Sequence, residues 1–295
     1  MAKQKATIFT GAATALITPM KNGGVDYEKL GELIEFQIAR KIDGLVSCGT
    51  TGEASTLTDE EHRECIRYTV EKSAKRVPVI AGTGSNDTDY AVALSKYACD
   101  VGADGLLLVT PYYNKATPKG LIQSFLAVAN VTNKPIILYN VPSRTGMNIP
   151  LSVYKELAKH ERIVATKEAS GNISAIAQIA AETDLDIYSG NDDQIVPILS
   201  LGGKGVISVL SNIMPEETHN ICQLWLENRP KDSLKLQLGL LELINTLFIE
   251  VNPIPVKAAC ALMGLSDAEI RLPLSEMEAD TYAKLTEELK KAKLI

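Results

Sequence analysis

The chain has 295 residues, of which 45% are hydrophobic and 22% are charged. This composition suffices for one large core or two modest ones and excludes a disordered chain. The formal net charge of −6 gives no electrostatic basis for binding nucleic acid or an anionic membrane. No apolar run reaches the roughly 18 residues that span a membrane, and the start, with Lys3 and Lys5, lacks the apolar stretch of a secretory signal. We therefore expect a cytoplasmic protein.

Cysteine and histidine usage argues against disulfides and a tightly bound metal. The five cysteines are scattered without a CxxC pair, which is typical of thiols in a reducing compartment. The three histidines form no HExxH motif and no cluster with cysteines, so no metal site is expected. These residues are Cys48, Cys65, Cys99, Cys222 and Cys260, and His62, His160 and His219.

Eight short apolar runs recur along the chain, each followed by a stretch with helical periodicity. Successive runs lie roughly 20 to 35 residues apart, about what one strand and one crossover helix require. Most runs are apolar throughout, a pattern typical of parallel strands covered on both faces. In chain order the predicted strands are Ala12–Ile17, Gly44–Cys48, Val77–Ala81, Gly105–Val109, Pro135–Tyr139, Ile163–Thr166, Asp186–Tyr188 and Val206–Val209.

Helix-start signals precede several of the stretches between these runs. Asp26 and Asp87 stand where N-caps are expected, and Thr58-Asp-Glu-Glu resembles a capping box. The strand signals stop after about Met214, and only helices are predicted beyond it. In chain order the predicted helices are Tyr27–Arg40, a stretch from Thr58 to about Lys75, Tyr90–Val101, Lys119–Val131, Glu216–Glu227, Ser233–Glu250, Pro255–Met263 and Ser275–Ala292.

Eight alternating strand and helix units predict an α/β fold, a (β/α)8 TIM barrel. The competing architecture is a doubly wound open sheet, but its GxGxxG fingerprint does not follow the first run. The stretch Gly202-Gly-Lys-Gly205 matches no P-loop spacing and is interpreted as a tight turn before the eighth strand. We expect residues 1–229 to form the catalytic barrel and residues 230–295 to form a C-terminal helical extension.

Active sites of such barrels lie at the C-terminal ends of the strands, so the residues that follow each run are candidates for chemistry. Lys167 is the most informative, because it ends a run that should be buried and lysine is rarely buried without a reason. A desolvated lysine loses basicity, and its neutral amine attacks carbonyl groups. A lysine that snorkels to the rim and pairs with Glu168 is the alternative, and the pattern alone leaves both open.

Hydroxyl groups and one arginine follow other strands. Thr50 and Thr51 lie between glycines, where they either form a plain turn or present hydroxyls to a carboxylate. Tyr113 and Tyr139 follow neighbouring strands, and their phenols serve either core packing or proton transfer in a site without histidine. Arg144 is either a surface residue or the bidentate partner of a carboxylate.

Taken together, these residues resemble a known family. The motifs Gly49-Thr-Thr-Gly-Glu53, Tyr139-Asn-Val-Pro-Ser-Arg144 and Lys167-Glu-Ala-Ser are similar to those of the class I pyruvate-dependent aldolases and lyases, typified by N-acetylneuraminate lyase and dihydrodipicolinate synthase. The resemblance runs from about Gly11 to the C-terminus, includes Asn252-Pro-Ile-Pro-Val-Lys257, and is closest to the dihydrodipicolinate (4-hydroxy-tetrahydrodipicolinate) synthases.

The resemblance implies a lyase that condenses pyruvate with L-aspartate 4-semialdehyde through a Schiff base, in lysine and diaminopimelate biosynthesis. No cofactor or metal is implied, because the imine itself accepts the electrons. The implied catalytic residues are Lys167, which forms the imine, Tyr139, which shuttles protons, and Thr50 and Tyr113, which complete a hydroxyl relay. The implied substrate-binding residues are Thr51 and the backbone at Ile207 for pyruvate, and Arg144 for the semialdehyde.

The resemblance also bears on assembly and regulation. In the family, the tyrosine that matches Tyr113 enters the neighbouring subunit's site, which implies a homo-oligomer, most often a dimer of dimers. The family's feedback site for lysine is only partly matched, because Asp59 stands where inhibited relatives often have histidine and Tyr90 where they often have an acid. Weak or no inhibition by lysine is therefore expected.

Two other hypotheses stay open. Another pyruvate aldolase would cleave N-acetylneuraminate or a 2-keto-3-deoxy sugar acid through the same imine. A non-enzymatic barrel that binds a metabolite as a sensor predicts no trapped adduct and little effect of Lys167→Ala.

Overall fold

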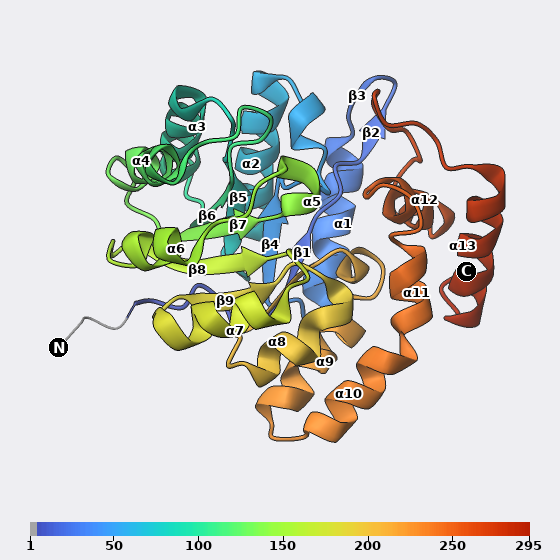
Figure 1. Ribbon diagram of the computed structural model, residues 1–295. Coiled ribbons are helices and arrows are strands. Elements are labelled where there is room, and N and C mark those ends of the chain that lie inside the picture. The colour runs from blue at the N-terminus through green and yellow to red at the C-terminus, as the bar shows by residue number, and fades with distance from the viewer. Residues whose placement is uncertain (1–4) are drawn as a thin grey trace.

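The computed structural model describes residues 5–295, and at its centre lies a closed parallel barrel (Figure 1). Its strands are β1 (Gly11–Ala15), β4 (Gly44–Ser47), β5 (Val79–Gly82), β6 (Gly105–Val109), β7 (Ile136–Asn140), β8 (Ile163–Glu168), β9 (Asp186–Ser189) and β10 (Gly205–Ser208). They pair in the order β1-β10-β9-β8-β7-β6-β5-β4, and β1 also pairs with β4, so the sheet has no free edge. The predicted (β/α)8 barrel is confirmed. Residues 1–4 lie outside the described residues. They belong to the N-terminal segment in which no secretory signal is expected.

Each predicted run coincides with one barrel strand, with ends that agree within two residues. Successive strand residues point to opposite sides, so one set fills the barrel and the other packs under the helices. This double coverage explains why the runs are apolar throughout. The set that fills the barrel includes Ala13, Ala15, Val46, Ile80, Leu107, Ile137, Tyr139, Ala165, Tyr188 and Ile207.

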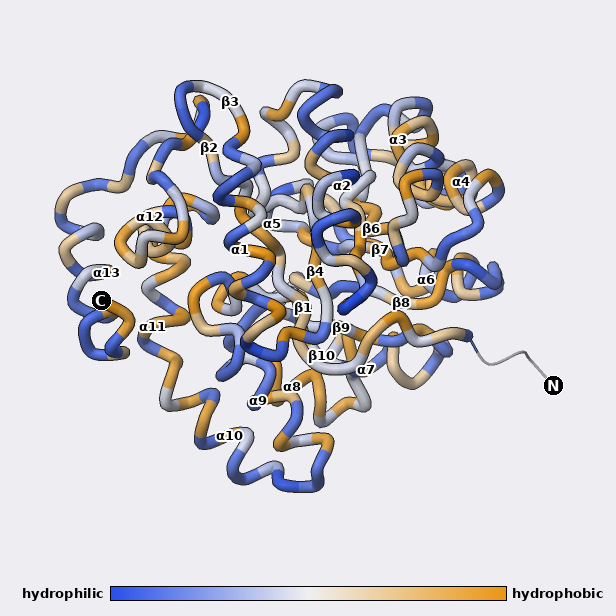
Figure 2. The backbone as a smooth tube through the Cα atoms, turned by 180° about the vertical axis from the view of Figure 1, so that it is seen from behind, coloured by the Kyte–Doolittle hydropathy of each residue, from blue (hydrophilic) through white to orange (hydrophobic). Residues whose placement is uncertain are grey.

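Helices surround the barrel, and their starts follow local capping rules. Asp26 accepts a hydrogen bond from the Lys29 N–H, and Thr58 and Glu61 form the predicted capping box. Blue and orange alternate along α4 in Figure 2, as in helices with one face on a core. The surrounding helices are α1 (Tyr27–Ala39), α2 (Asp59–Ser73), α3 (Thr88–Asp100), α4 (Pro118–Ala129), α6 (Leu151–Leu157), α7 (Ile173–Glu182), α8 (Ile195–Ser200) and α9 (Pro215–Leu226).

The remaining helices gather on one side of the barrel (Figure 1). They are α10 (Pro230–Gly239), α11 (Leu241–Thr246), α12 (Ile254–Leu262) and α13 (Ala279–Lys291). The prediction of one helix over Ser233–Glu250 is wrong, because the chain breaks at Leu240, whose φ of −100° and ψ of 0° end α10. The adjacent Gly239 is a poor helix former, which weakens a continuous helix there. The division of the chain at residue 229 stays a prediction.

Several short elements escaped prediction. An antiparallel hairpin of β2 (Met20–Lys21) and β3 (Gly24–Val25) follows β1, and α5 (Pro142–Thr145) follows β7. The predicted turn before the eighth strand is confirmed, and Gly202 lies there with φ of +87°. Within residues 5–295, no helix is long and apolar enough to cross a membrane.

Candidate active site

Lys167 and Tyr139 lie side by side inside the mouth of the barrel. They are directly opposite in the register of β8 and β7, so both side chains point inward. Each is only 6% exposed, and the Lys167 Nζ lies 4.3 Å from the centre of the Tyr139 ring. The predicted nucleophile is therefore buried beside the predicted proton carrier.

The other neighbours of Lys167 leave its amine without an ionic partner. Among the described residues, no carboxylate lies within ion-pair distance of its Nζ. Gly190, at the end of β9, makes room for the side chain, because a Cβ there would lie 3.1 Å from the Lys167 Cε and 2.8 Å from the Ala169 Cβ. A larger residue at this position would crowd Ala169 and the lysine.

Glu168 points to the opposite side of β8 from Lys167. It is buried against hydroxyl and amide donors: the Tyr154 hydroxyl, the Ser170 Oγ at 2.8 Å and the Asn140 Nδ2 at 3.2 Å. Burial raises the pKa of Glu168, and these donors oppose the rise. The alternative of a rim lysine paired with Glu168 is therefore wrong, and Glu168 instead anchors β8 behind the barrel wall.

Asp192 is a buried carboxyl group near Lys167 that the sequence reasoning did not assign to the site. Its Oδ2 accepts hydrogen bonds from the Val209 and Leu210 N–H groups at 3.0 and 2.9 Å, while its Oδ1 has no protein partner among residues 5–295. Burial raises its pKa, and the charge of Lys167 is among the influences that lower it. Asp192 thus holds the turn that follows β10, next to Ile207.

A cavity of about 280 Å³ opens over this end of the barrel. Thr50, Tyr139 and Arg144 line it, so the structure brings three of the seven predicted site residues to one space. Ile207 lies fully buried in the interior cluster that includes Tyr139. The cavity is also lined by Cys48, Gly49, Ala54, Ser55, His62, Gly82, Gly84, Ser85, Tyr90, Leu107, Val109, Tyr112, Val141 and Thr145.

Tyr113 does not join the other predicted residues within one chain. Its side chain is 91% exposed, and its backbone has a φ of +70° in the loop that follows β6. The hydroxyl relay that the resemblance implies is therefore incomplete in a single chain. Its role stays a prediction that depends on a second subunit.

The C-terminal extension supplies contacts that the sequence reasoning missed. Thr51 accepts a hydrogen bond from the Asn252 Nδ2 at 3.0 Å, and the Arg144 Nη2 donates to the Asn252 carbonyl at 2.9 Å. Lys257 forms an ion pair with Glu53 at 2.6 Å, and both side chains are 1% exposed. Asn252 and Lys257 are the first and last residues of one of the motifs that carry the family resemblance. That motif pointed to this segment, but nothing in the local sequence indicates which residues its side chains contact.

The arrangement suits chemistry through an amine, with hydroxyl groups and an arginine around it. Among the described residues, no group of three or more His, Cys, Asp or Glu side chains is arranged to hold a metal ion.

Comparisons with known proteins identify the family of the chain. The model of the dihydrodipicolinate synthetase family matches residues 8–292. The chain is 59% identical to the 4-hydroxy-tetrahydrodipicolinate synthase of Lachnoclostridium phytofermentans and 56% identical to that of Acetivibrio thermocellus; each match covers 98% of this chain and 99% of the relative. A solved dihydrodipicolinate synthase from Acinetobacter baumannii superposes with a TM-score of 0.95, at 41% identity over 98% of this chain and 100% of the other. The chain belongs to the dihydrodipicolinate synthetase family.

Proposed function

We propose that this chain condenses pyruvate with L-aspartate 4-semialdehyde to 4-hydroxy-tetrahydrodipicolinate, a step of lysine and diaminopimelate biosynthesis. The observation that carries the proposal is the buried Lys167 beside Tyr139, unpaired with any carboxylate among the described residues, in a chain of this family. The related enzymes from Lachnoclostridium phytofermentans and Acetivibrio thermocellus bear this activity in their names, and the relative from Acinetobacter baumannii is complexed with pyruvate. These findings favour the synthase over a sugar-acid aldolase.

The chemistry begins at the amine of Lys167. The neutral amine attacks C2 of pyruvate, water leaves, and the resulting iminium draws electrons from the neighbouring methyl group. That methyl group loses a proton, and the enamine so formed attacks the aldehyde carbon of the second substrate. The amino group of the second substrate then adds to the imine carbon, which closes the ring and releases the amine of Lys167. Tyr139 moves protons at these steps, because its phenol is beside the amine, and Thr50 and the partner chain's copy of Tyr113 carry them to solvent.

Two further groups hold the substrates. The Thr51 hydroxyl and the backbone at Ile207 bind the pyruvate carboxylate, and Arg144 binds the carboxylate of the semialdehyde. The proposed reaction needs no metal or organic cofactor, because the protonated imine accepts the electrons.

We infer that the protein works as a homo-oligomer in the cytoplasm, arranged as a dimer of dimers. The exposure of Tyr113 supports the oligomer, since a hydroxyl needed for the relay lies away from the cavity of its own chain. Sedimentation velocity together with mixing of Tyr113→Phe and Lys167→Ala chains tests the assembly. Partial recovery of activity in the mixture is expected, because some sites then receive both side chains intact.

Borohydride reduction in the presence of pyruvate, followed by mass spectrometry, tests the imine. We expect one reduced pyruvyl group on the peptide that contains Lys167. An unmodified Lys167, or label on another lysine, would refute the proposal.

The second substrate needs a separate assay, because other pyruvate aldolases form the same imine. We expect turnover with aspartate semialdehyde and none with N-acetylneuraminate or 2-keto-3-deoxy sugar acids. Cleavage of a sugar acid at a comparable rate would show that the alternative activity is the correct one.

A further inference from the structure

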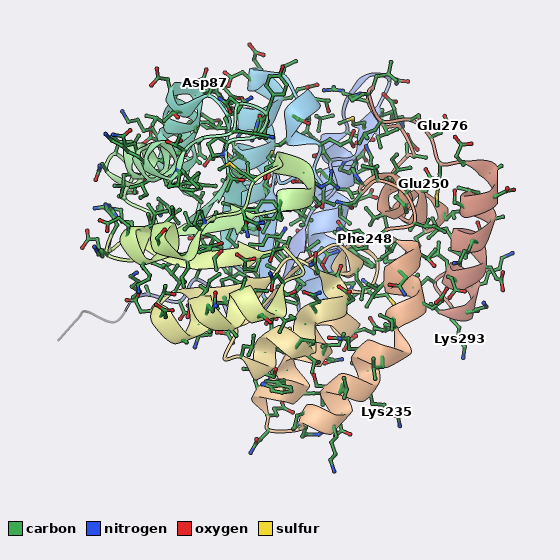
Figure 3. All side chains as sticks on the ribbon, viewed as in Figure 1. Asp87, Lys235, Phe248, Glu250, Glu276 and Lys293 are labelled. Atoms are coloured by element: carbon green, nitrogen blue, oxygen red, sulfur yellow. The ribbon has the colours of Figure 1, made fainter. Side chains whose placement is uncertain are left out.

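The segment that joins α11 to α12 contacts two substrate-binding residues at once. Figure 3 labels Phe248 and Glu250, which follow α11 on the side where the C-terminal helices gather. Two residues after Glu250, Asn252 is 6% exposed and hydrogen-bonds both Thr51 and Arg144. These contacts span 201 and 108 positions of the sequence, so only the folded chain brings them together.

The contact with Thr51 fixes the direction of a hydroxyl. The Asn252 Nδ2 is a donor only, so the Thr51 Oγ1 must accept in this 3.0 Å hydrogen bond. A threonine hydroxyl has a single hydrogen, which is then left to donate elsewhere. Accepting one hydrogen bond also strengthens the hydroxyl as a donor in the next. Thr51 is therefore set to donate to a carboxylate.

The contact with Arg144 uses the backbone of Asn252 instead. One Nη2 hydrogen of the guanidinium is taken by the Asn252 carbonyl at 2.9 Å, and the group has four further N–H donors for a ligand. Since Arg144 is otherwise an exposed side chain at the cavity, this hydrogen bond reduces the number of conformations open to it.

The ion pair of Glu53 with Lys257 joins the loop that carries Thr51 to the start of α12. Glu53 lies two residues after Thr51, and Lys257 lies in the first turns of α12, just after Asn252. The second oxygen of Glu53 accepts from the Arg271 N–H at 3.2 Å, so a third part of the extension joins the loop. The backbone around Asn252 is thus held next to the loop that carries Thr51.

We propose that Asn252 is a positioning residue, whose side-chain amide orients the Thr51 hydroxyl toward the pyruvate carboxylate and whose carbonyl holds Arg144 for the second substrate. The inference rests on the proposed function. According to this proposal the C-terminal extension takes part in substrate recognition. The Asn252 side chain acts on pyruvate binding and the Asn252 carbonyl acts on binding of the second substrate.

The substitution Asn252→Asp tests the side-chain half of the proposal. A carboxylate of the same shape can only accept, so it takes the Thr51 hydrogen and places a negative charge near the pyruvate carboxylate. We expect the KM for pyruvate to rise about 10- to 150-fold, the range for loss of a hydrogen bond to a charged group. The KM for the semialdehyde should change less than about threefold, because Arg144 bonds the unchanged backbone. Lowering the pH should partly restore the pyruvate KM, since the new carboxyl group regains a donor when it is protonated.

Asn245→Asp is the matched control, because it makes the same chemical change on the exposed side of α11. It should leave both KM values unchanged. Asn252→Ala, which removes the donor without adding charge, serves as a second variant if Asn252→Asp does not fold. It should raise the pyruvate KM about three- to tenfold, and this effect should disappear in a Thr51→Val background, because both changes remove one interaction.

In the folded Asn252→Asp protein the Thr51 hydroxyl donates to residue 252 and not to pyruvate. An unchanged pyruvate KM would therefore overturn the inference, because it would show that pyruvate binding does not need this hydroxyl. Equal rises in both KM values would also overturn it, because they indicate a general disturbance of the cavity. A wild-type chain without a trapped pyruvate adduct would refute the proposed function and this inference with it. An adduct together with an unaltered KM in Asn252→Asp would refute only the role of Asn252.

Discussion

Lys167 and Lys257 are both buried, in different regions of the molecule, and their surroundings differ. Lys257, where α12 meets the barrel, is paired with Glu53 at 2.6 Å, and both side chains are 1% exposed. Burial lowers the pKa of Lys257, and the charge of Glu53 opposes that effect. Lys167, inside the barrel mouth, has the ring of Tyr139 at 4.3 Å and no carboxylate within ion-pair distance among the described residues. A buried lysine with a carboxylate is suited to hold structure, and one without is suited to react.

The substitution Lys167→Met tests the role of the lysine that has no carboxylate partner. We expect the rate of product formation to fall at least about 10³-fold, because this variant lacks the amine that is the proposed nucleophile. The free energy of unfolding should change little, since no ion pair is broken. Steady-state rates and urea denaturation check both expectations. Retention of a tenth of the activity would contradict the assigned role of Lys167.

The same change at the other lysine, Lys257→Met, should act on stability. It leaves the buried Glu53 carboxylate without its partner, and we expect a loss of about 3 to 5 kcal/mol of unfolding free energy. Urea denaturation measures this loss. Adding Glu53→Gln should recover part of it, because the unpaired charge is then removed, and a double variant no more stable than the single one would argue against the ion pair.

Tyr139→Phe separates the ring of Tyr139 from its hydroxyl, because it keeps the ring beside Lys167 and removes only the hydroxyl. We expect kcat to fall about 10²-fold through the loss of proton transfer. The KM for pyruvate should stay within about threefold, since the proposed function assigns the carboxylate to Thr51 and not to Tyr139. Borohydride trapping should still label Lys167, and a failure to label it would mean that the phenol is needed to bury or orient the amine.

At the end of the barrel where the strands begin, His219 is paired with the carboxylate of Asp43, as Lys257 is paired with Glu53. The His219 Nδ1 lies 2.8 Å from Asp43 Oδ2, and this contact raises the pKa of His219 above its ordinary value. The folded state therefore holds the proton more tightly than the unfolded state. The stabilisation is fully present below the unfolded pKa of about 6.5 and is lost as the pH rises through the higher folded pKa.

We expect this contribution to be less than about 1 kcal/mol, because the histidine is partly exposed. His219→Asn is the control, since it does not titrate, and the difference in unfolding free energy between the two proteins should narrow from pH 5.5 to pH 9. His62 and His160, whose pKa values burial lowers, act in the opposite direction but are common to both proteins. A difference that stays constant with pH would show that the pair contributes nothing through protonation.

The smallest expected effect concerns free lysine as an inhibitor, because its amino group would need a carboxylate of its own. Asp59 already accepts from Arg63 at 2.8 Å, and its neighbour Tyr90, whose pKa burial and Asp59 raise to about 12, is no acid. We expect 1 mM lysine to change the activity by less than about 10%, because half-occupancy at this concentration already needs about 4 kcal/mol of binding free energy. A fall in activity at sub-millimolar lysine would contradict this expectation.

Much of this molecule follows from its sequence. Continuous apolar runs at regular spacing predicted every barrel strand, because strands buried on both faces need apolar residues on both sides. The ends of those runs placed Lys167, Tyr139, Thr50 and Arg144 at one mouth, and the structure brings three of them around the cavity with Lys167 beside Tyr139. The family motifs added the substrates, which no local pattern could supply.

Other features depended on contacts that local patterns do not encode. Periodicity favoured one helix over Ser233–Glu250, yet the chain breaks near Gly239, where the weak propensity of one residue gives way to packing of the extension on the barrel. Glu168 is adjacent to Lys167 in sequence but points to the other side of the sheet, so proximity along the chain suggested a pair that the strand geometry forbids.

The eight strands, the barrel and the place of Lys167 at the end of a strand follow from the sequence alone, because alternation and hydrophobic runs act over a few residues at a time. Only the tertiary structure decided that Asn252 reaches Thr51 across 201 positions and that Lys257 reaches Glu53 across 204. Such pairings are set by how whole elements pack, and the donors and acceptors of a buried site must be matched in space rather than along the chain.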